Sequence, residues 1–259
     1  MLFDTHAHLY AAEFEADREA MMERASTQQV THIMLPNIEE SSVAGMYALQ
    51  QRYPQQVLLA MWLHPCSVKE DYVRVLKNLE QELDRPDKKF YAIGEMGLDF
   101  YWDKQYAEQQ REAFRIQCTW ALQRQLPLLI HSRESTRSCL DLLQEMDPDN
   151  KLRGVFHCFS GTAEEAEDIV ARGFYLGIGG VVTFKKSGLS DLLQPIPLQH
   201  LVLETDAPYL APVPYRGKRN ESSYLPLIAQ HLALTRNISV EEVGRITTEN
   251  AMALFGIRL

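Results

Sequence analysis

The chain begins Met1-Leu2-Phe3-Asp4-Thr5-His6-Ala7-His8, a short apolar run, Leu2–Thr5, that ends in two histidines. Further short runs rich in apolar and β-branched residues follow along the chain. Continuous apolar runs of this kind are typical of strands that are buried on both faces. The complete set of predicted strands is Leu2–Thr5, Val30–Pro36, Val57–Leu63, Phe90–Gly94, Leu128–Ile130, Gly154–Phe156, Phe174–Ile178 and Leu201–Leu203.

Segments with helical spacing lie between these runs. Leu225, Ile228 and Leu232 follow the i, i+3, i+7 pattern of a helix face. Two capping boxes mark helix starts, one from Thr162 to Glu165 and one from Ser239 to Glu242. The order is therefore strand, helix, strand, helix along the whole chain, which indicates a parallel sheet with crossover helices.

Eight such repeats within 259 residues match a closed (β/α)₈ barrel of the TIM type, whose active sites form at the carboxyl ends of the strands. No linker or shift in composition divides the chain, so we expect one domain over residues 1–259. An open doubly wound sheet is the alternative. It is less favoured because no Gly-x-Gly-x-x-Gly motif follows the first run.

The composition places the chain among globular proteins. Hydrophobic residues make up 46% and charged residues 24%. No apolar run is long enough for a membrane span, and the first residues lack the pattern of a signal peptide. The 4 cysteines form no Cys-x-x-Cys pair, so we expect free thiols and a cytoplasmic location. The net charge of −9 argues against a non-specific nucleic-acid binder, although bound cations or a local basic cluster can reverse the potential at one site.

Side chains that bind metal ions follow the ends of the predicted strands. His6-Ala7-His8 places two imidazoles on one side of an extended chain. The carboxylates Glu95 and Asp206 follow apolar runs, where burial is costly unless the charge is paired or bound to metal. The other histidines in such positions are His64, His131 and His157. Nitrogen and oxygen donors without a thiolate suit Zn²⁺, Mn²⁺ or Mg²⁺, and we expect two divalent ions.

The motifs resemble those of the TatD family of metal-dependent deoxyribonucleases, which are barrels of the amidohydrolase type. They are Phe3-Asp4-Thr5-His6-Ala7-His8, Leu63-His64-Pro65, Gly94-Glu95-Met96-Gly97-Leu98-Asp99, His131-Ser132-Arg133, His157-Cys158-Phe159-Ser160-Gly161 and Glu204-Thr205-Asp206-Ala207-Pro208-Tyr209-Leu210. The resemblance implies one metal ion on His6, His8 and Asp206. It implies a second ion on His131 and His157, with Glu95 bridging. Trp62, Cys66 and Ser222 depart from the family pattern, but no metal position does.

Three residues are candidates for the catalytic steps. We expect Asp206 to take a proton from the attacking water and Glu204, two residues earlier on the same face, to orient the water or a metal ligand. A structural ion pair is the alternative for Glu204. His64 is expected to hydrogen-bond a phosphate oxygen or to protonate the leaving group, and a purely structural role is its alternative.

Basic and aromatic side chains also follow the strands. We expect Arg133, Arg216 and Arg219 to bind substrate phosphates and to offset the acidic total charge locally. A solvated charged loop is the alternative for Arg216 and Arg219. The aromatic residues in these loops are Trp62, Phe100-Tyr101-Trp102, Phe159, Tyr209 and Tyr215. Bases can stack on such rings, but packing of the loops over the barrel is the favoured interpretation for most of them. Phe159 is the exception and is a candidate for substrate binding.

These observations predict a hydrolase of phosphodiester bonds, a deoxyribonuclease that works as an exonuclease on single-stranded DNA ends with water activated by two metal ions. The alternative is a small-molecule hydrolase of the same barrel type that opens a lactone, amide or ester. A metal-stabilised binding or scaffold protein without activity is a third, less favoured reading, because degenerate enzymes usually lose a ligand and none is missing here.

Overall fold

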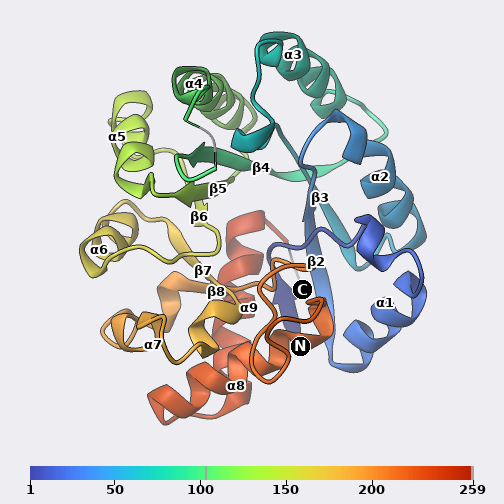
Figure 1. The fold of residues 1–259 in the computed structure, drawn as a ribbon, viewed down its shortest axis with the longest axis vertical. Coiled ribbons are helices and arrows are strands. Elements are labelled where there is room, and N and C mark those ends of the chain that lie inside the picture. Colours follow the sequence, from blue (N-terminus) through green and yellow to red (C-terminus); the bar gives the residue numbers. More distant parts are fainter. Residues whose placement is uncertain (103, 258–259) are drawn as a thin grey trace.

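The computed structural model describes residues 1–102 and 104–257 and shows a parallel eight-stranded sheet in the order β1 to β8. Its helices surround the strands on the outside (Figure 1). The strands are β1 (Leu2–Asp4), β2 (Val30–Pro36), β3 (Val57–Met61), β4 (Phe90–Asp99), β5 (Leu128–Arg133), β6 (Gly154–Phe156), β7 (Tyr175–Ile178) and β8 (Leu201–Leu203). The helices are α1 (Arg18–Thr27), α2 (Val43–Arg52), α3 (Tyr72–Leu83), α4 (Ala107–Arg124), α5 (Thr136–Met146), α6 (Ala163–Ala171), α7 (Leu189–Leu192), α8 (Leu225–Arg236) and α9 (Val240–Phe255).

The two edge strands meet and close the barrel. Thr5 N donates to Leu203 O at 3.0 Å, and a parallel bridge joins Ala7 to Ala207 just beyond the strand ends. His8 N donates to Ala207 O at 2.7 Å. The predicted TIM-type barrel is therefore confirmed, and the open doubly wound alternative is wrong, because β1 and β8 lie side by side instead of at opposite edges.

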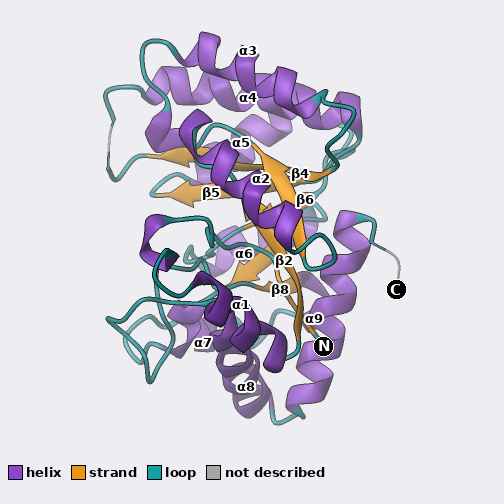
Figure 2. Ribbon diagram, turned by 90° about the vertical axis from the view of Figure 1, so that its right-hand side faces the viewer, coloured by secondary structure: helices purple, strands orange, loops and turns teal. Residues whose placement is uncertain are grey.

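The amino end of the barrel is closed by the last helix. Figure 2 shows strand arrowheads pointing toward one end of the molecule and α9 at the opposite end. The Phe3 and Phe255 rings pack with their centroids 5.5 Å apart, within a buried apolar cluster. That cluster joins α9 to alternate residues of the strands, namely Phe3, Met34, Leu58, Ala60, Ala92, Leu129, Val155 and Val202. The carboxyl end of the barrel is thus left for polar side chains.

Most predicted strand boundaries hold within one or two residues, and β4 is the main difference. It runs to Asp99 instead of ending at Gly94, because the pairing with β5 continues to Asp99 opposite Arg133. Glu95 therefore lies inside a strand and not after it. β3 ends at Met61, two residues earlier than predicted.

The predicted helix starts are confirmed with one refinement. Thr162 and Glu165 exchange both hydrogen bonds of a capping box at the start of α6. At α9 the Ser239 side chain accepts from Glu242 N, but the Glu242 carboxylate pairs with Arg245 instead of returning to the cap.

All 4 cysteines lie within the described residues and are free, as predicted. Across residues 1–102 and 104–257, the helices are too short or too polar to cross a bilayer.

We predict that Gly97→Ala destabilises the barrel whereas Gly45→Ala does not. Gly97 has a φ of +148°, and a Cβ there would lie 1.8 Å from the carbonyl oxygen of His131. The cost should exceed about 2 kcal/mol. Gly45 lies within α2, where a Cβ would meet Tyr10 Cβ at an ordinary 3.5 Å, so alanine should be neutral or stabilising by up to about 1 kcal/mol. Thermal unfolding followed by circular dichroism checks both; a Gly97→Ala midpoint at or above that of the unmodified protein would contradict the prediction.

Candidate metal centre

Backbone pairing beyond the ends of β1 and β8 positions three possible metal ligands, His6, His8 and Asp206. Ala7 bridges to Ala207, and Asp206 N donates to His6 O at 2.9 Å. Because the chain is extended here, His6 and His8 lie on the same side, next to Asp206. His8 Nε2 is 3.7 Å from Asp206 Oδ1. Closure of the barrel thus brings together possible metal ligands that follow the first and the last strand.

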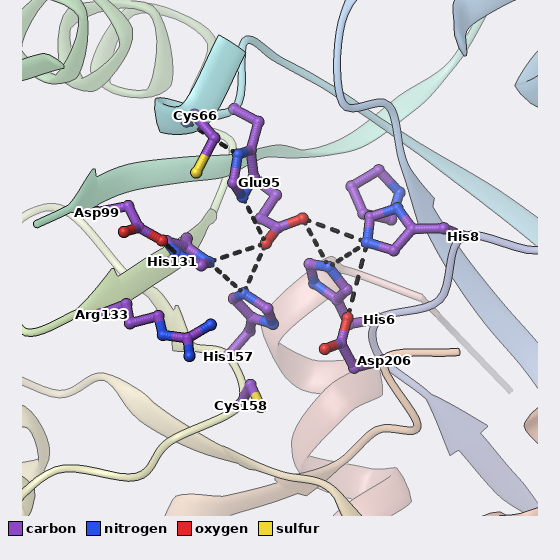
Figure 3. A network of polar contacts seen from close by, with 12 residues as sticks. His6, His8, Cys66, Glu95, Asp99, His131, Arg133, His157, Cys158 and Asp206 are labelled. Carbon is purple, nitrogen blue, oxygen red and sulfur yellow. Dashed lines mark hydrogen bonds and ion pairs between the residues drawn. The ribbon is translucent and has the colours of Figure 1, made fainter. Parts of the chain in front are cut away.

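Glu95 lies at the middle of the cluster, with one carboxylate oxygen toward each of two histidine pairs (Figure 3). Its Oε2 is 3.1 Å from His6 Nε2 and 3.3 Å from His8 Nε2. Its Oε1 is 3.1 Å from His131 Nδ1 and 2.8 Å from His157 Nε2. A carboxylate in this arrangement can bridge two cations, one beside each pair.

The spacing of the nitrogens fits metal ions. His6 Nε2 and His8 Nε2 are 3.3 Å apart, and His131 Nδ1 and His157 Nε2 are 3.2 Å apart. Two nitrogens bound at 2.0–2.1 Å to one ion with tetrahedral angles would be separated by about 3.4 Å. The donor atoms of His6, His8 and Asp206 also lie within 4.8 Å of one another. The residues present therefore fit one cation beside each histidine pair.

Hydrogen bonds on the far side of two rings leave a lone pair directed at the centre. The Tyr10 hydroxyl donates to Pro36 O at 2.7 Å, so its oxygen accepts from His8 Nδ1–H at 3.0 Å. Asp99 Oδ2 accepts from His131 Nε2–H at 2.9 Å. In the neutral form of both rings the other nitrogen then carries no proton, as metal ligation requires. The sequence analysis did not single out Tyr10 or Asp99, although the spacing of four residues from Glu95 to Asp99 along β4 places both on one face.

The hydrogen bond to His64 places its ring proton on the opposite side, toward Glu95. The backbone N–H of Cys66 donates to its Nδ1 at 3.1 Å, so a neutral ring carries its proton on Nε2. This Nε2 is 3.2 Å from Glu95 Oε1. Among the histidines of the centre, His64 is therefore arranged as a hydrogen-bond donor, although its position next to Glu95 and His131 also satisfies the spacing of a ligand set.

Burial and neighbouring charge shift the pKa values of Glu95 and Asp206 in opposite directions. Burial acts to raise the pKa of Glu95, but the positive potential of His157, His64 and His6 outweighs it and holds that pKa well below its usual range. Burial raises the pKa of Asp206 to about 7, against the lowering effect of His157 and His8. Glu95 is thus charged at neutral pH, whereas Asp206 can gain or lose a proton there.

Glu204 and Arg133 lie at the edge of the centre. Glu204 is fully buried, accepts a hydrogen bond from the backbone of Cys158 and has Oε1 3.6 Å from His157 Nδ1. Figure 3 shows Arg133 on the same side as His131 and Asp99. Its guanidinium lies over the Tyr101 ring at 4.0 Å.

Two of the other predicted substrate-binding residues, Phe159 and Arg219, are not available to contact a substrate. Phe159 is only 3% exposed and packs within the core, so the structure offers no free ring face there. Arg219 pairs with Asp17 at 2.6 Å and with Glu221 at 3.3 Å, so its charge is already compensated. The sequence could not reveal this, because Asp17 lies 202 residues away. Arg216 is exposed, with its guanidinium 4.5 Å over the Phe184 ring.

We predict that Asp99→Asn weakens binding of Mn²⁺ or Zn²⁺ by about 10- to 100-fold, because the amide no longer holds His131 with a full negative charge. Isothermal titration of the purified protein measures this. Asp141→Asn, an exposed position on α5, is the matched control and should bind metal as the unmodified protein does. Equal affinities for the two variants would contradict the role given to Asp99.

Comparison with known proteins agrees with this geometry. The family model described as TatD related DNase matches residues 3–256. The chain is 38% identical to the Bacillus subtilis protein named uncharacterized metal-dependent hydrolase YabD, over 99% of this chain and 100% of that one. It is 32% identical to the Erwinia tasmaniensis 3′-5′ ssDNA/RNA exonuclease TatD, with coverage of 99% and 100%. The crystal structure of the Escherichia coli TatD homologue YjjV superimposes with a TM-score of 0.92 at 30% identity, covering 99% and 98% of the two chains. The chain therefore belongs to the TatD family of metal-dependent hydrolases.

Proposed function

We propose that the protein hydrolyses phosphodiester bonds at the ends of single-stranded DNA, with two divalent cations held by the centre described above. The observation that carries the proposal is the position of Glu95, whose two oxygens each face a separate histidine pair. The ligands would be His6, His8 and Asp206 for one ion and His131 and His157 for the other, with Glu95 between them. The relatives named 3′-5′ ssDNA/RNA exonuclease support single strands as substrate and attack from the 3′ end.

Divalent cations bound here would polarise the phosphoryl group and lower the pKa of water. The side chains supply the proton transfers. Asp206 is the proposed base, because it is a buried carboxylate whose Oδ1 lies 3.7 Å from His8 Nε2. His64 Nε2–H is the proposed donor to a phosphate oxygen or to the leaving group. Glu204 is the proposed positioning residue, because its Oε1 lies 3.6 Å from His157 Nδ1, on the side of the ring away from Glu95.

The charge distribution is compatible with an anionic substrate despite the net charge of −9. Within the described residues, Arg133 and Arg216 have no carboxylate within 4.0 Å, so their positive charge is available to phosphates. Arg219 adds little, since Asp17 and Glu221 neutralise it.

The proposal is tested with single-stranded DNA labelled at either end and incubated with Mg²⁺, Mn²⁺ or Zn²⁺, followed by mapping of the products. We expect stepwise shortening from the 3′ end that stops on addition of a chelator. Turnover of lactones, amides or simple esters with no cleavage of DNA would instead support the small-molecule hydrolase. Bound metal with no turnover of any ester would support the scaffold reading.

We predict that Asp206→Asn lowers kcat on DNA by about 10²- to 10⁴-fold, because the amide cannot accept the proton. Steady-state kinetics measure the loss, and a melting curve shows whether the variant is folded. Turnover by Asp206→Asn at the rate of the unmodified protein would remove Asp206 from the proton transfer.

His64→Ala distinguishes a donor from a ligand. We expect kcat to fall by about 10²-fold while the affinity for Mn²⁺ changes little, because His64 presents N–H to the centre. His131→Ala is the comparison and should lose metal affinity as well. Loss of metal binding in His64→Ala would show that this ring is a ligand.

A further inference from the structure

Two aromatic rings and one arginine form an exposed cluster beside the metal centre, which we call the aromatic step (Tyr101, Trp102 and Arg133). Tyr101 is 51% exposed and Trp102 is 67% exposed, so these rings do not pack the loop against the barrel as the sequence analysis favoured. Their planes are 87° apart, with centroids separated by 4.9 Å. The Arg133 guanidinium carbon lies 4.0 Å from the Tyr101 centroid and 5.2 Å from that of Trp102.

The backbone of the aromatic step is fixed to the metal centre through one carboxylate. Asp99 Oδ1 accepts hydrogen bonds from Tyr101 N and Trp102 N, each at 2.9 Å. The other oxygen, Oδ2, accepts from His131 Nε2–H at 2.9 Å. Asp99 therefore sets the position of the two rings relative to a proposed metal ligand. Because these contacts come from backbone amides, replacing the Trp102 side chain leaves them in place.

Arg133 is available to a ligand. In residues 1–102 and 104–257 its guanidinium makes no ion pair and lies over the two rings. It also lines a cavity of about 470 Å³ with hydroxyl residues from the end of β5 and from the loop after β6, among them Ser132, Ser160 and Thr162. Two rings that are about half or more exposed and a guanidinium without an ion pair, next to hydroxyl groups, match the chemistry of a nucleotide, which offers a flat base and a phosphate.

The geometry points to the aromatic step as a subsite for one unpaired nucleobase of the substrate strand, on the His131 side of the bond that is cut, with Arg133 on the adjoining phosphate. This inference rests on the proposed function and names the part of the substrate that the site recognises. A base inside a duplex has both faces covered by its neighbours, so the subsite favours single strands by stacking and does not select a base sequence.

Fluorescence tests occupancy without turnover. Trp62 and Trp120 are buried, so Trp102 is the tryptophan whose emission a stacked base can quench directly. We expect a short single-stranded oligodeoxynucleotide, in Ca²⁺ or at low temperature to slow cleavage, to quench the emission of the unmodified protein. Trp102→Phe should lose most of this quenching and retain binding. Quenching of equal size in Trp102→Phe would overturn the subsite.

Kinetics on oligonucleotides with one abasic position test the same point. The unmodified protein should lose roughly tenfold in kcat/KM when the abasic position reaches the subsite. In Trp102→Ala, kcat/KM should not depend on where the abasic position lies. Trp102→Phe should keep part of the dependence. Tyr53→Ala is the matched control: Arg52 lies 5.9 Å over the Tyr53 ring at the carboxyl end of α2, away from the centre. It should keep the full abasic effect.

The outcomes separate the two proposals. Quenching that depends on Trp102 without cleavage would support the subsite and overturn the nuclease function. Cleavage with an abasic profile that is the same in the unmodified protein and in Trp102→Ala would support the nuclease function and overturn the subsite.

Discussion

The buried carboxylate of Glu95 is the constraint on which the centre depends. A charge inside a barrel is tolerated only where opposite charge or hydrogen-bond donors surround it. Here histidines from β1, β5 and β6 converge on its two oxygens. The same convergence leaves nitrogen donors close enough to share a cation. The electrostatic requirement of folding and the requirement of metal binding are therefore met by one set of side chains.

Hydrogen bonds on the outer nitrogens of the imidazoles decide whether each ring presents a lone pair or an N–H to Glu95. Tyr10 and Asp99 accept hydrogen bonds from the outer N–H groups of His8 and His131, so the inner nitrogens of the neutral rings present lone pairs. The backbone of Cys66 does the reverse for His64 and turns its proton inward. Rings of the same chemical type thus present either a lone pair or an N–H to Glu95 because of a single hydrogen bond, which no pattern of histidines alone could distinguish.

Much of the fold was predictable because the barrel repeats a strong local signal. Short apolar runs alternate with helical segments, and closure then brings the strand ends together, which is why His6 and Asp206 were expected to meet. The length of β4 was not predicted, since Glu95 interrupts its apolar run while the pairing with β5 continues. The environments of Arg219 and Phe159 were also beyond the sequence. Ion-pair partners such as Asp17 and the packing of a ring in the core depend on contacts between distant segments.

Closure of the barrel by β1 and β8 also bears on how the centre is made during synthesis. Ala7 bridges to Ala207, and His6 and Asp206 become neighbours only through that contact. A nascent chain emerges from the ribosome with its amino-terminal segments first. The proposed ligands up to His157 can therefore come together early, but Asp206, which follows β8, is added only when roughly four-fifths of the polypeptide has been made. The proposed ligand set is then completed late, and shortened translation products that stop before β8 would lack Asp206.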